Sequence, residues 1–152
     1  MKISIIIPTY NSELVIEECL EGIISSNFTD YELIVIDNLS VDSTLDIVKK
    51  YTKKVITLQK DMERNHARNE GLNHARGEII VFIDSDNVIY PNSLQIVADY
   101  FDQNPNISAV TGSVSIEHPN NNFFSQYKNL YMNYILGQMP LTITFLQGDI
   151  YA

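Results

Sequence analysis

Polar side chains follow three apolar segments of the sequence at the positions where strands would end. Residues 8–11 (Pro-Thr-Tyr-Asn) follow ISIII, residues 37–38 (Asp-Asn) follow ELIVI, and residues 84–86 (Asp-Ser-Asp) follow EIIVFI. In open α/β sheets, ligands bind beyond the carboxyl ends of the strands. If the three strands are parallel, the three groups lie along one edge of one sheet. Together they predict a single binding site.

The segment Asp84-Ser85-Asp86 indicates a divalent-cation site. One carboxylate can hold Mg²⁺ or Mn²⁺ while the ion keeps positions free for phosphate oxygens. Such a cation offsets the charge that grows on a diphosphate leaving group. The alternative is an acidic turn that only ends the strand, and for so short a motif alone the two interpretations stay even.

Three further side chains are candidates for ligand contact. Asp37 can accept hydrogen bonds from a base or a ribose, or it can form an Asx turn at the start of a helix. Tyr10 can stack on a base or pack against a loop. Arg68 can pair with a phosphate or an aspartate, or be an ordinary surface arginine. Taken alone, Asp37 favours ligand contact, whereas Tyr10 and Arg68 favour the structural role.

The elements that must position these residues are short apolar runs that alternate with segments of helical period. Strands are predicted at 3–7, 32–37, 55–58, 78–84, 107–116 and 142–152, and helices at 12–26, 41–53, 66–75, 91–103 and 123–137. Strands that are apolar on both faces and alternate with helices predict a mostly parallel α/β sheet with right-handed crossovers and helices on both faces.

The ends of the predicted helices carry their own signals. Asn11 or Ser12 is the predicted N-cap of the first helix, and Ser40 that of the second. Gly77 is predicted to end the third helix in the left-handed conformation, and Asn104-Pro105 to stop the fourth.

Composition excludes several classes of function. The net charge of −9 has the wrong sign for nucleic-acid binding. One cysteine, Cys19, excludes an internal disulfide, and its place on an apolar helix face predicts a core residue. No apolar run approaches the ~20 residues that span a bilayer. The chain is therefore expected in the cytoplasm, with the cytoplasmic face of the membrane as the alternative.

Taken together, four ordered blocks resemble the family 2 glycosyltransferases of the GT-A fold. The blocks are ISIIIPTYN, YELIVIDNLSVDST, ARNEGLNHARG and EIIVFIDSDN. The resemblance implies that residues 1–152 form a single Rossmann-like domain that binds a nucleotide sugar. Members of the family transfer a sugar from a nucleoside diphosphate with inversion at the anomeric carbon.

The resemblance also implies roles for individual residues. The nucleotide sugar is expected to contact Pro8, Tyr10, Asp37, Arg68 and Asp84, and Mg²⁺ or Mn²⁺ to bind Asp86. The family's acidic catalytic base matches no residue here, so it is expected beyond Ala152 and the domain is expected to be truncated at its C-terminus. The loop at 61–66 departs from the family's glycine-containing stretch.

Donor and acceptor remain open at this point. UDP is the predicted nucleotide, with GDP and dTDP as alternatives, and the acceptor is a glycan, a polysaccharide or a lipid carrier. The aromatic-rich segment 123–137 fits a core helix or a helix on a membrane surface, and some family members carry membrane helices after the catalytic domain. Membrane association would then come through a region beyond Ala152.

Two other functions compete with glycosyl transfer. A sugar-phosphate nucleotidyltransferase is disfavoured because residues 8–11 stand where that class has a glycine-rich opening. A non-catalytic nucleotide-binding module fits the lack of a matching base.

Overall fold

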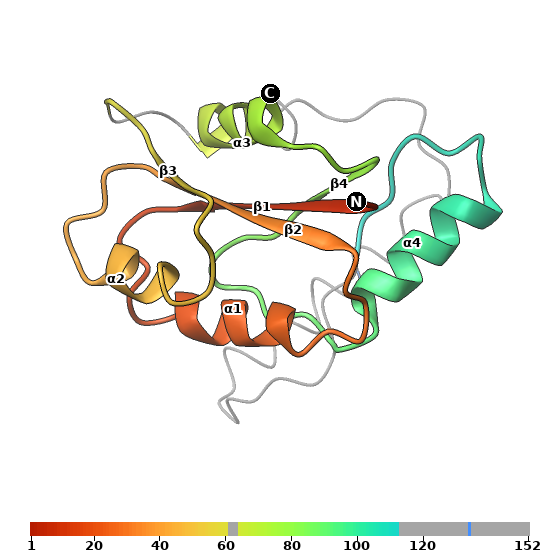
Figure 1. Ribbon diagram of the computed structural model, residues 1–152, viewed down its shortest axis with the longest axis horizontal. Helices are drawn as coiled ribbons and strands as arrows, with labels where there is room; N and C mark the ends of the chain where they lie inside the picture. The colour runs from red at the N-terminus through yellow and green to blue at the C-terminus, as the bar shows by residue number, and fades with distance from the viewer. Residues whose placement is uncertain (61–63, 113–133, 135–152) are drawn as a thin grey trace. The chain divides into compact units, whose positions relative to one another are not determined.

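The computed structural model describes residues 1–60, 64–112 and 134. The chain divides into two units, Met1–Pro105 and Asn106–Ala152. All helices and strands with defined bounds lie in the first unit (Figure 1). In chain order they are β1 (Ile3–Thr9), α1 (Ile16–Ile24), β2 (Tyr31–Asp37), α2 (Thr44–Val48), β3 (Val55–Thr57), α3 (Arg64–His74), β4 (Ile79–Phe82) and α4 (Ser93–Gln103).

The strands form one parallel sheet in the order β3-β2-β1-β4. The first strand of the chain, β1, is therefore central: Ile3 is opposite Tyr31 of β2 and Ile79 of β4. Because the pairs are parallel, the carboxyl ends of β1, β2 and β4 lie at the same edge. The predicted parallel sheet is confirmed, and with it the common edge for the three polar groups.

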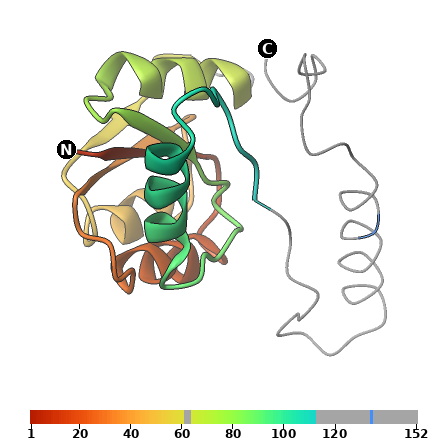
Figure 2. The same ribbon diagram turned by 90° about the vertical axis from the view of Figure 1, so that its right-hand side faces the viewer.

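Helices cover both faces of the sheet, as the apolar runs predict. In Figures 1 and 2, α3 lies on one side of the sheet and α1 on the other. Successive side chains of a strand point to opposite faces. Accordingly, Ile5 of β1 belongs to the larger core cluster with α1, α2 and α4, whereas Ile6 belongs to a second cluster with Ala67 of α3.

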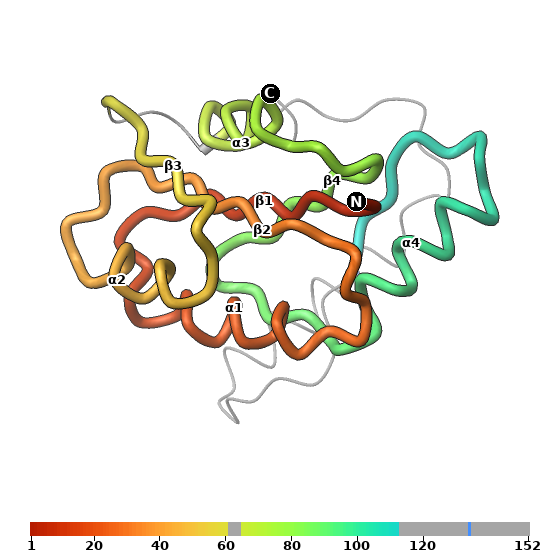
Figure 3. The backbone as a smooth tube through the Cα atoms, in the orientation of Figure 1, coloured from red at the N-terminus to blue at the C-terminus, as the bar shows by residue number. Residues whose placement is uncertain are grey.

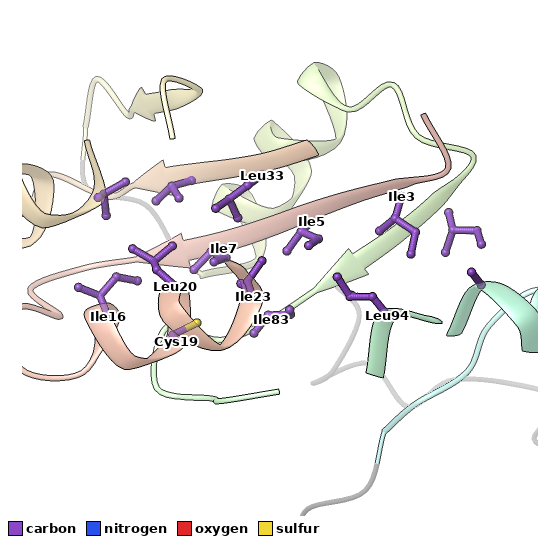
Figure 4. Packing of buried hydrophobic residues seen from close by; sticks show 14 residues of the cluster. Ile3, Ile5, Ile7, Ile16, Cys19, Leu20, Ile23, Leu33, Ile83 and Leu94 are labelled. Carbon is purple, nitrogen blue, oxygen red and sulfur yellow. The ribbon is translucent and has the colours of Figure 1, made fainter. Parts of the chain in front are cut away.

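The larger cluster is dense around α1 (Figure 4). Ile5 and Ile7 face Leu20 and Ile23, and all four side chains are fully buried. Each such side chain contributes about 2 kcal/mol of transfer free energy to folding. Cys19 is also fully buried in this cluster, so its predicted place in the core is confirmed.

Two predicted helix caps are wrong. Helix α1 begins at Ile16 with no side-chain cap, because Asn11 and Ser12 make contacts to other loops instead. Helix α2 begins at Thr44, again without a side-chain cap, and ends at Val48, well inside the predicted range 41–53. Ser40 does not cap it, since its Oγ accepts a hydrogen bond from the Asn11 N–H at 2.9 Å.

Gly77 follows α3 as predicted but does not adopt the predicted left-handed conformation: no described glycine has a positive φ. Its lack of a side chain allows close approach to β1. An added Cβ at Gly77 would lie 2.4 Å from the backbone nitrogen of Ser4. The Gly77 N–H donates to Ser4 Oγ at 2.7 Å. Glycine is therefore required here by packing.

A buried polar network joins β1, β2 and the turn before β4. The Glu32 carboxylate accepts hydrogen bonds from Ser4 Oγ at 2.6 Å and from the Arg76 N–H at 2.7 Å, and it pairs with the Lys54 ammonium. Burial alone would raise the pKa of Glu32, but the bonds from Lys54, Ser4 and Arg76 outweigh it and lower the pKa to about 2. The carboxylate is thus held ionised inside the fold.

The second unit is described only at 106–112 and 134. Residues 107–112 form no strand, so the predicted strand at 107–116 is wrong over that part. The predicted helix at 123–137 lies outside the described residues except for Tyr134, which is helical. The predicted strand at 142–152 lies outside them entirely. Among the helices described, none has the length and apolar character needed to cross a membrane.

Candidate active site

A cavity of about 450 Å³ lies at the carboxyl edge of the sheet. The loops that follow β1, β2 and β4 all contribute to its wall, as do the start of α1 and one residue of α3. The lining residues are Pro8, Thr9, Tyr10, Asn11, Ser12, Val15, Asn38, Ala67, Asp84, Ser85 and Asp86. The structure therefore brings the three polar groups into one wall.

The loops after β1 and β2 are tied to each other along their length (Figure 3). Asn11 Oδ1 accepts the Val41 N–H at 2.9 Å, and Thr44 Oγ1 accepts the Ser12 N–H at 2.7 Å. Two residues of these loops have positive φ, Asn11 at 46° and Leu39 at 66°. Asparagine tolerates this region, but for leucine it costs about 1–2 kcal/mol. The loops after β1 and β2 thus form a hydrogen-bonded double loop at the cavity, with local strain at Leu39.

Two carboxylates brace the same double loop from outside the cavity. Asp42 accepts the Glu13 N–H at 3.1 Å, and Glu13 accepts the Ser43 N–H at 2.9 Å. Burial would raise the pKa of Asp42, but hydrogen bonds from Thr44 and from the Glu13 N–H lower it on balance. These acids serve loop structure, which accounts for the acidic Ser-x-Asp stretch after β2.

The two aspartates after β4 have different surroundings. Asp84 Oδ1 accepts a hydrogen bond from the Arg68 guanidinium at 2.7 Å. Asp86 is exposed, and its carboxylate has no hydrogen bond or ion pair within the described part of the chain. Asp86 is therefore the carboxylate that can bind a ligand without first losing a protein partner.

The loop that carries these aspartates is fixed by two side chains from the region of α1. Ser12 Oγ lies 3.0 Å from Ser85 Oγ, and Cys19 Sγ lies 3.6 Å from the Asp84 carbonyl oxygen. Burial, with the charges of Asp86 and Asp84, raises the pKa of the Cys19 thiol to about 12. The thiol stays protonated at neutral pH and can donate to that carbonyl.

Thr9 carries an unpaired hydroxyl at the cavity wall. The residue is 3% exposed, and its Oγ1 has no hydrogen-bond partner in the described structure. Leaving a buried hydroxyl unpaired costs about 1–3 kcal/mol.

The predicted site residues divide into two groups. Pro8, Tyr10, Asp84 and Asp86 line the cavity. The buried Asp37 does not, and its carboxylate accepts the Ser40 N–H at 3.3 Å.

Arg68 also lies outside the lining and reaches it through its pair with Asp84. The ligand contacts of all six residues stay predictions.

Sequence reasoning missed three lining residues. Ser12 was assigned to a helix cap, and Val15 and Ala67 read as ordinary apolar residues at helical spacing. Nothing in residue type separates a Val or Ala that faces a cavity from one that faces the core. These positions follow only from where α1 and α3 meet the sheet.

The cavity also bears on which ligands can bind. Among the described residues that line it, two are carboxylates and none is basic. The described part of the chain contains no group of three or more His, Cys, Asp or Glu residues that could enclose a metal ion. The donor set suits a hard cation that takes one or two carboxylates and completes its shell with phosphate and water. A protein-only metal cage is not supported among these residues.

Comparisons with known proteins agree with this geometry. Residues 4–149 match the family model described as glycosyl transferase family 2. The poly(ribitol-phosphate) beta-N-acetylglucosaminyltransferase TarS of Staphylococcus aureus is 39% identical over 110 residues, which are 68% of this chain and 19% of TarS. A poly(ribitol-phosphate) beta-glucosyltransferase of Bacillus spizizenii is 41% identical over 102 residues, covering 62% of this chain and 16% of that protein. This chain therefore aligns with less than a fifth of the length of TarS.

Solved structures give the same result. The crystal structure of S. aureus TarS 1–349 in complex with UDP-GlcNAc has a TM-score of 0.66 at 34% identity, covering 77% of this chain and 39% of that one. The mannosyltransferase PcManGT of Pyrobaculum calidifontis, in complex with GDP-Man and Mn²⁺, has a TM-score of 0.62 at 27% identity, covering 66% and 32%.

Proposed function

The chain belongs to glycosyl transferase family 2, and we propose that it binds the donor for a metal-dependent transfer of a sugar from a nucleoside diphosphate to an acceptor hydroxyl. The predicted Rossmann-like GT-A fold is confirmed by the family match and the structural neighbours. The activity itself is a proposal for the protein in which this chain acts, because the alignment spans only 19% of TarS.

One observation carries the proposal: the cavity at the carboxyl edge of the sheet joins all three polar strand ends. The strands that end here lie in the order β2, β1, β4, so Asn38, Tyr10 and the two aspartates Asp84 and Asp86 follow one another along this edge. Tyr10 offers an aromatic face for a nucleobase. Asp84 and Asp86 form an acidic end. This order suits a ligand with a base at one end and a diphosphate at the other.

The charge of the cavity argues for metal dependence. A diphosphate would enter a wall with two carboxylates and no basic residue among those described, on a chain with a net charge of −9. Without a cation, the like charges would repel each other. We propose that Asp86 holds Mg²⁺ or Mn²⁺, which when bound neutralises charge on the diphosphate. Mn²⁺ in the PcManGT complex supports this choice.

The proposed donor is a UDP-sugar. UDP-GlcNAc in the TarS complex supports uridine, whereas GDP-Man in PcManGT shows that one fold accommodates another base. The sugar is left unassigned, because the two poly(ribitol-phosphate) relatives are named for different sugars at nearly equal identity. A cell-wall or other polysaccharide polymer is the acceptor that these relatives favour.

The transfer that we propose is a direct displacement. The acceptor oxygen forms a bond to the anomeric carbon while the bond from that carbon to the diphosphate oxygen breaks, which inverts the configuration. The electron pair leaves on the diphosphate, and a carboxylate base takes the acceptor proton. The residues described here bind and orient the donor, and none of them is assigned as the base.

The first test is calorimetric titration of the chain with UDP in the presence of Mn²⁺, then with EDTA, and then with the Asp86→Ala variant. We expect metal-dependent binding by the unmodified chain, and a loss of at least tenfold in affinity in the other two measurements. Removing Asp86 takes away the carboxylate that has no protein partner among the described residues.

Asp46→Ala is the matched control. Asp46 is exposed on α2 and lies outside the cavity lining, so the variant changes the net charge equally and should bind UDP normally. Equal weakening by both substitutions would contradict a specific role for Asp86. A folded chain that binds UDP, GDP and dTDP equally poorly with Mn²⁺ would contradict the proposed donor site.

A non-catalytic nucleotide-binding module predicts the same binding without transfer. Release of UDP from a UDP-sugar, measured with the full-length protein and a polyol-phosphate acceptor, separates the two. We expect release that depends on the acceptor and on Mn²⁺.

A further inference from the structure

We propose that Ser12 and Ser85 are positioning residues: their hydroxyl contact, here called the serine pair, couples the metal side of the cavity to its nucleotide side. The contact between the two hydroxyls is observed in the geometry of the loops, whereas its effect on ligand binding rests on the proposed function. The serine pair joins residues 73 positions apart in the chain, with Oγ atoms 3.0 Å from each other.

The serine pair lies where backbone pairing no longer holds the two loops together. The ladder between β1 and β4 ends at Ile6 opposite Phe82, followed by one bond from the Ile83 N–H to the Ile6 carbonyl at 3.1 Å. Beyond this point the segments after β1 and β4 have no ladder between them, and both line the cavity. The serine pair links these two segments again through their side chains.

Ser12 is a fixed point for this contact. Its N–H is bound by Thr44 Oγ1 at 2.7 Å, Thr44 is fully buried, and Ser12 itself is 8% exposed. These contacts hold the backbone of Ser12 in place, and burial leaves its side chain little room to turn away from Ser85.

The direction of the hydrogen bonds follows from counting protons. Ser12 Oγ donates to the Tyr10 carbonyl at 3.2 Å, and a serine hydroxyl has one proton to donate. The arrangement that makes both bonds at once has Ser85 donating to Ser12 Oγ in the serine pair. The result is a chain of bonds from Ser85 through Ser12 to the backbone of Tyr10.

This chain connects the two ends of the proposed ligand. Ser85 lies between Asp84 and Asp86, so holding its side chain restricts the backbone of the proposed metal ligand Asp86. At the other end, the Tyr10 backbone carries the ring proposed to face the nucleobase. If metal binding and nucleotide binding each stabilise the serine pair, each will strengthen the other, and this coupling is reciprocal.

Hydrogen–deuterium exchange on the unliganded chain tests the structural part. The Asn87 N–H donates to the Asp84 carbonyl at 3.0 Å and so reports on the turn that contains Ser85. We expect Ser12→Ala to speed exchange at Asn87, and Ser85→Ala to speed exchange at Ser12. Ser25→Ala, which removes a hydroxyl bonded to the Gly22 carbonyl at 2.9 Å, is the matched control and should change neither. Unchanged exchange at Asn87 in Ser12→Ala overturns the inference.

Calorimetry with UDP and Mn²⁺ tests the coupling. Loss of one neutral hydrogen bond corresponds to about a 3- to 10-fold loss of affinity. We expect that loss in Ser12→Ala and in Ser85→Ala, no further loss in the double variant, and recovery in Ser85→Thr, which keeps the hydroxyl. A double variant in which the two losses multiply overturns the inference.

The two proposals fail in different ways. If the unmodified chain binds UDP with Mn²⁺ and both serine variants bind equally well, the serine pair has no positioning role and the proposed function stands. If the unmodified chain does not bind UDP, the proposed function and its coupling fall together, while exchange still decides whether the serine pair holds the turn.

Discussion

Two aspartates only two positions apart are given different tasks by their neighbours. Asp84 is held by the Arg68 guanidinium at 2.7 Å, and its side chain is 37% exposed. Asp86 has no such partner among the described residues and faces the cavity. An arginine beside one carboxylate lowers the repulsion that a diphosphate would meet, and it leaves the second carboxylate available. Residue type alone does not separate the two, and they were distinguished from sequence only through the family resemblance.

Replacing Arg68 tests this division. Arg68→Ala leaves the charge of Asp84 uncompensated next to the proposed diphosphate position, so we expect UDP affinity with Mn²⁺ to fall about tenfold. Titration calorimetry measures it. Arg76→Ala removes an equal charge from an exposed side chain outside the cavity and should bind normally. Equal or tighter binding by Arg68→Ala would contradict a supporting role for the pair between Arg68 and Asp84.

Glu32 gives a prediction about pH. Its pKa in the fold, about 2, lies below the ordinary 4.5, so its contribution to stability is complete above pH 4.5 and is lost as the pH falls toward 2. Because the Lys54 side chain is 41% exposed, solvent screens the pair. We expect Glu32→Gln to lower the free energy of unfolding by about 1–2 kcal/mol at pH 6, and by less at pH 3. Urea unfolding at both values measures this, and a constant difference would contradict it.

Residue types predicted which groups could do chemistry but not their partners. Asp84 and Asp86 could be chosen because they follow a predicted buried strand, at the edge of the sheet where ligands bind. Asp37 satisfied the same rule, yet its carboxylate binds the Ser40 N–H from within the fold. The distinction depends on where the following loop returns, and that loop is set by contacts with the loop after β1.

At the scale of elements, the four strands of the sheet and the end of α4 at Gln103 were predicted well, and the N-caps of α1 and α2 poorly, for one physical reason. A strand buried on both faces reads directly as an apolar run, as ISIII does for β1. A cap residue is predicted from a bond to its own helix, but the side chains of Asn11 and Ser40 each accept a hydrogen bond from the other's loop. Contacts between distant segments leave no local pattern in the sequence.

Gly77 provides a test at this scale. An added Cβ would meet backbone atoms of Ile3 and Ser4 at 2.6 and 2.4 Å, and a backbone inside a sheet cannot move aside. We expect Gly77→Ala to lower the free energy of unfolding by about 2–3 kcal/mol. Chemical denaturation measures it.

Gly112→Ala is the matched control, since an added Cβ there meets nothing within 4 Å. An equal effect of both substitutions would assign the loss to the general properties of alanine. It would then contradict the close approach between Gly77 and β1.

At the scale of the molecule, every residue that lines the cavity belongs to the first unit, Met1–Pro105. The parallel sheet and its ligand edge could be predicted because alternating strands and helices allow few topologies. The prediction that residues 1–152 form a single domain stays a prediction. A strand was wrongly predicted at 107–112 because the β-branched residues there suit one. Whether a strand forms also depends on pairing with another segment, which residue type does not reveal.

Ligand binding should stabilise the whole first unit. A ligand that binds only the folded chain adds about 2.7 kcal/mol to the free energy of unfolding when present at 100 times its Kd. We therefore expect UDP with Mn²⁺ to raise the Tm in differential scanning calorimetry, and EDTA to abolish the shift. A shift of equal size with UDP and EDTA would contradict the metal-dependent site.

The central place of β1 has a consequence during translation. β1 leaves the ribosome before both of its partners, whose paired residues follow 28 positions later in β2 and 76 positions later in β4. At about 5–20 residues per second, the wait for β4 lasts about 4–15 s. Throughout it, one edge of an isoleucine-rich strand stays open to other nascent chains. Until β4 emerges, the central strand of the finished sheet is an edge strand, with the risk of pairing to other chains that such edges carry.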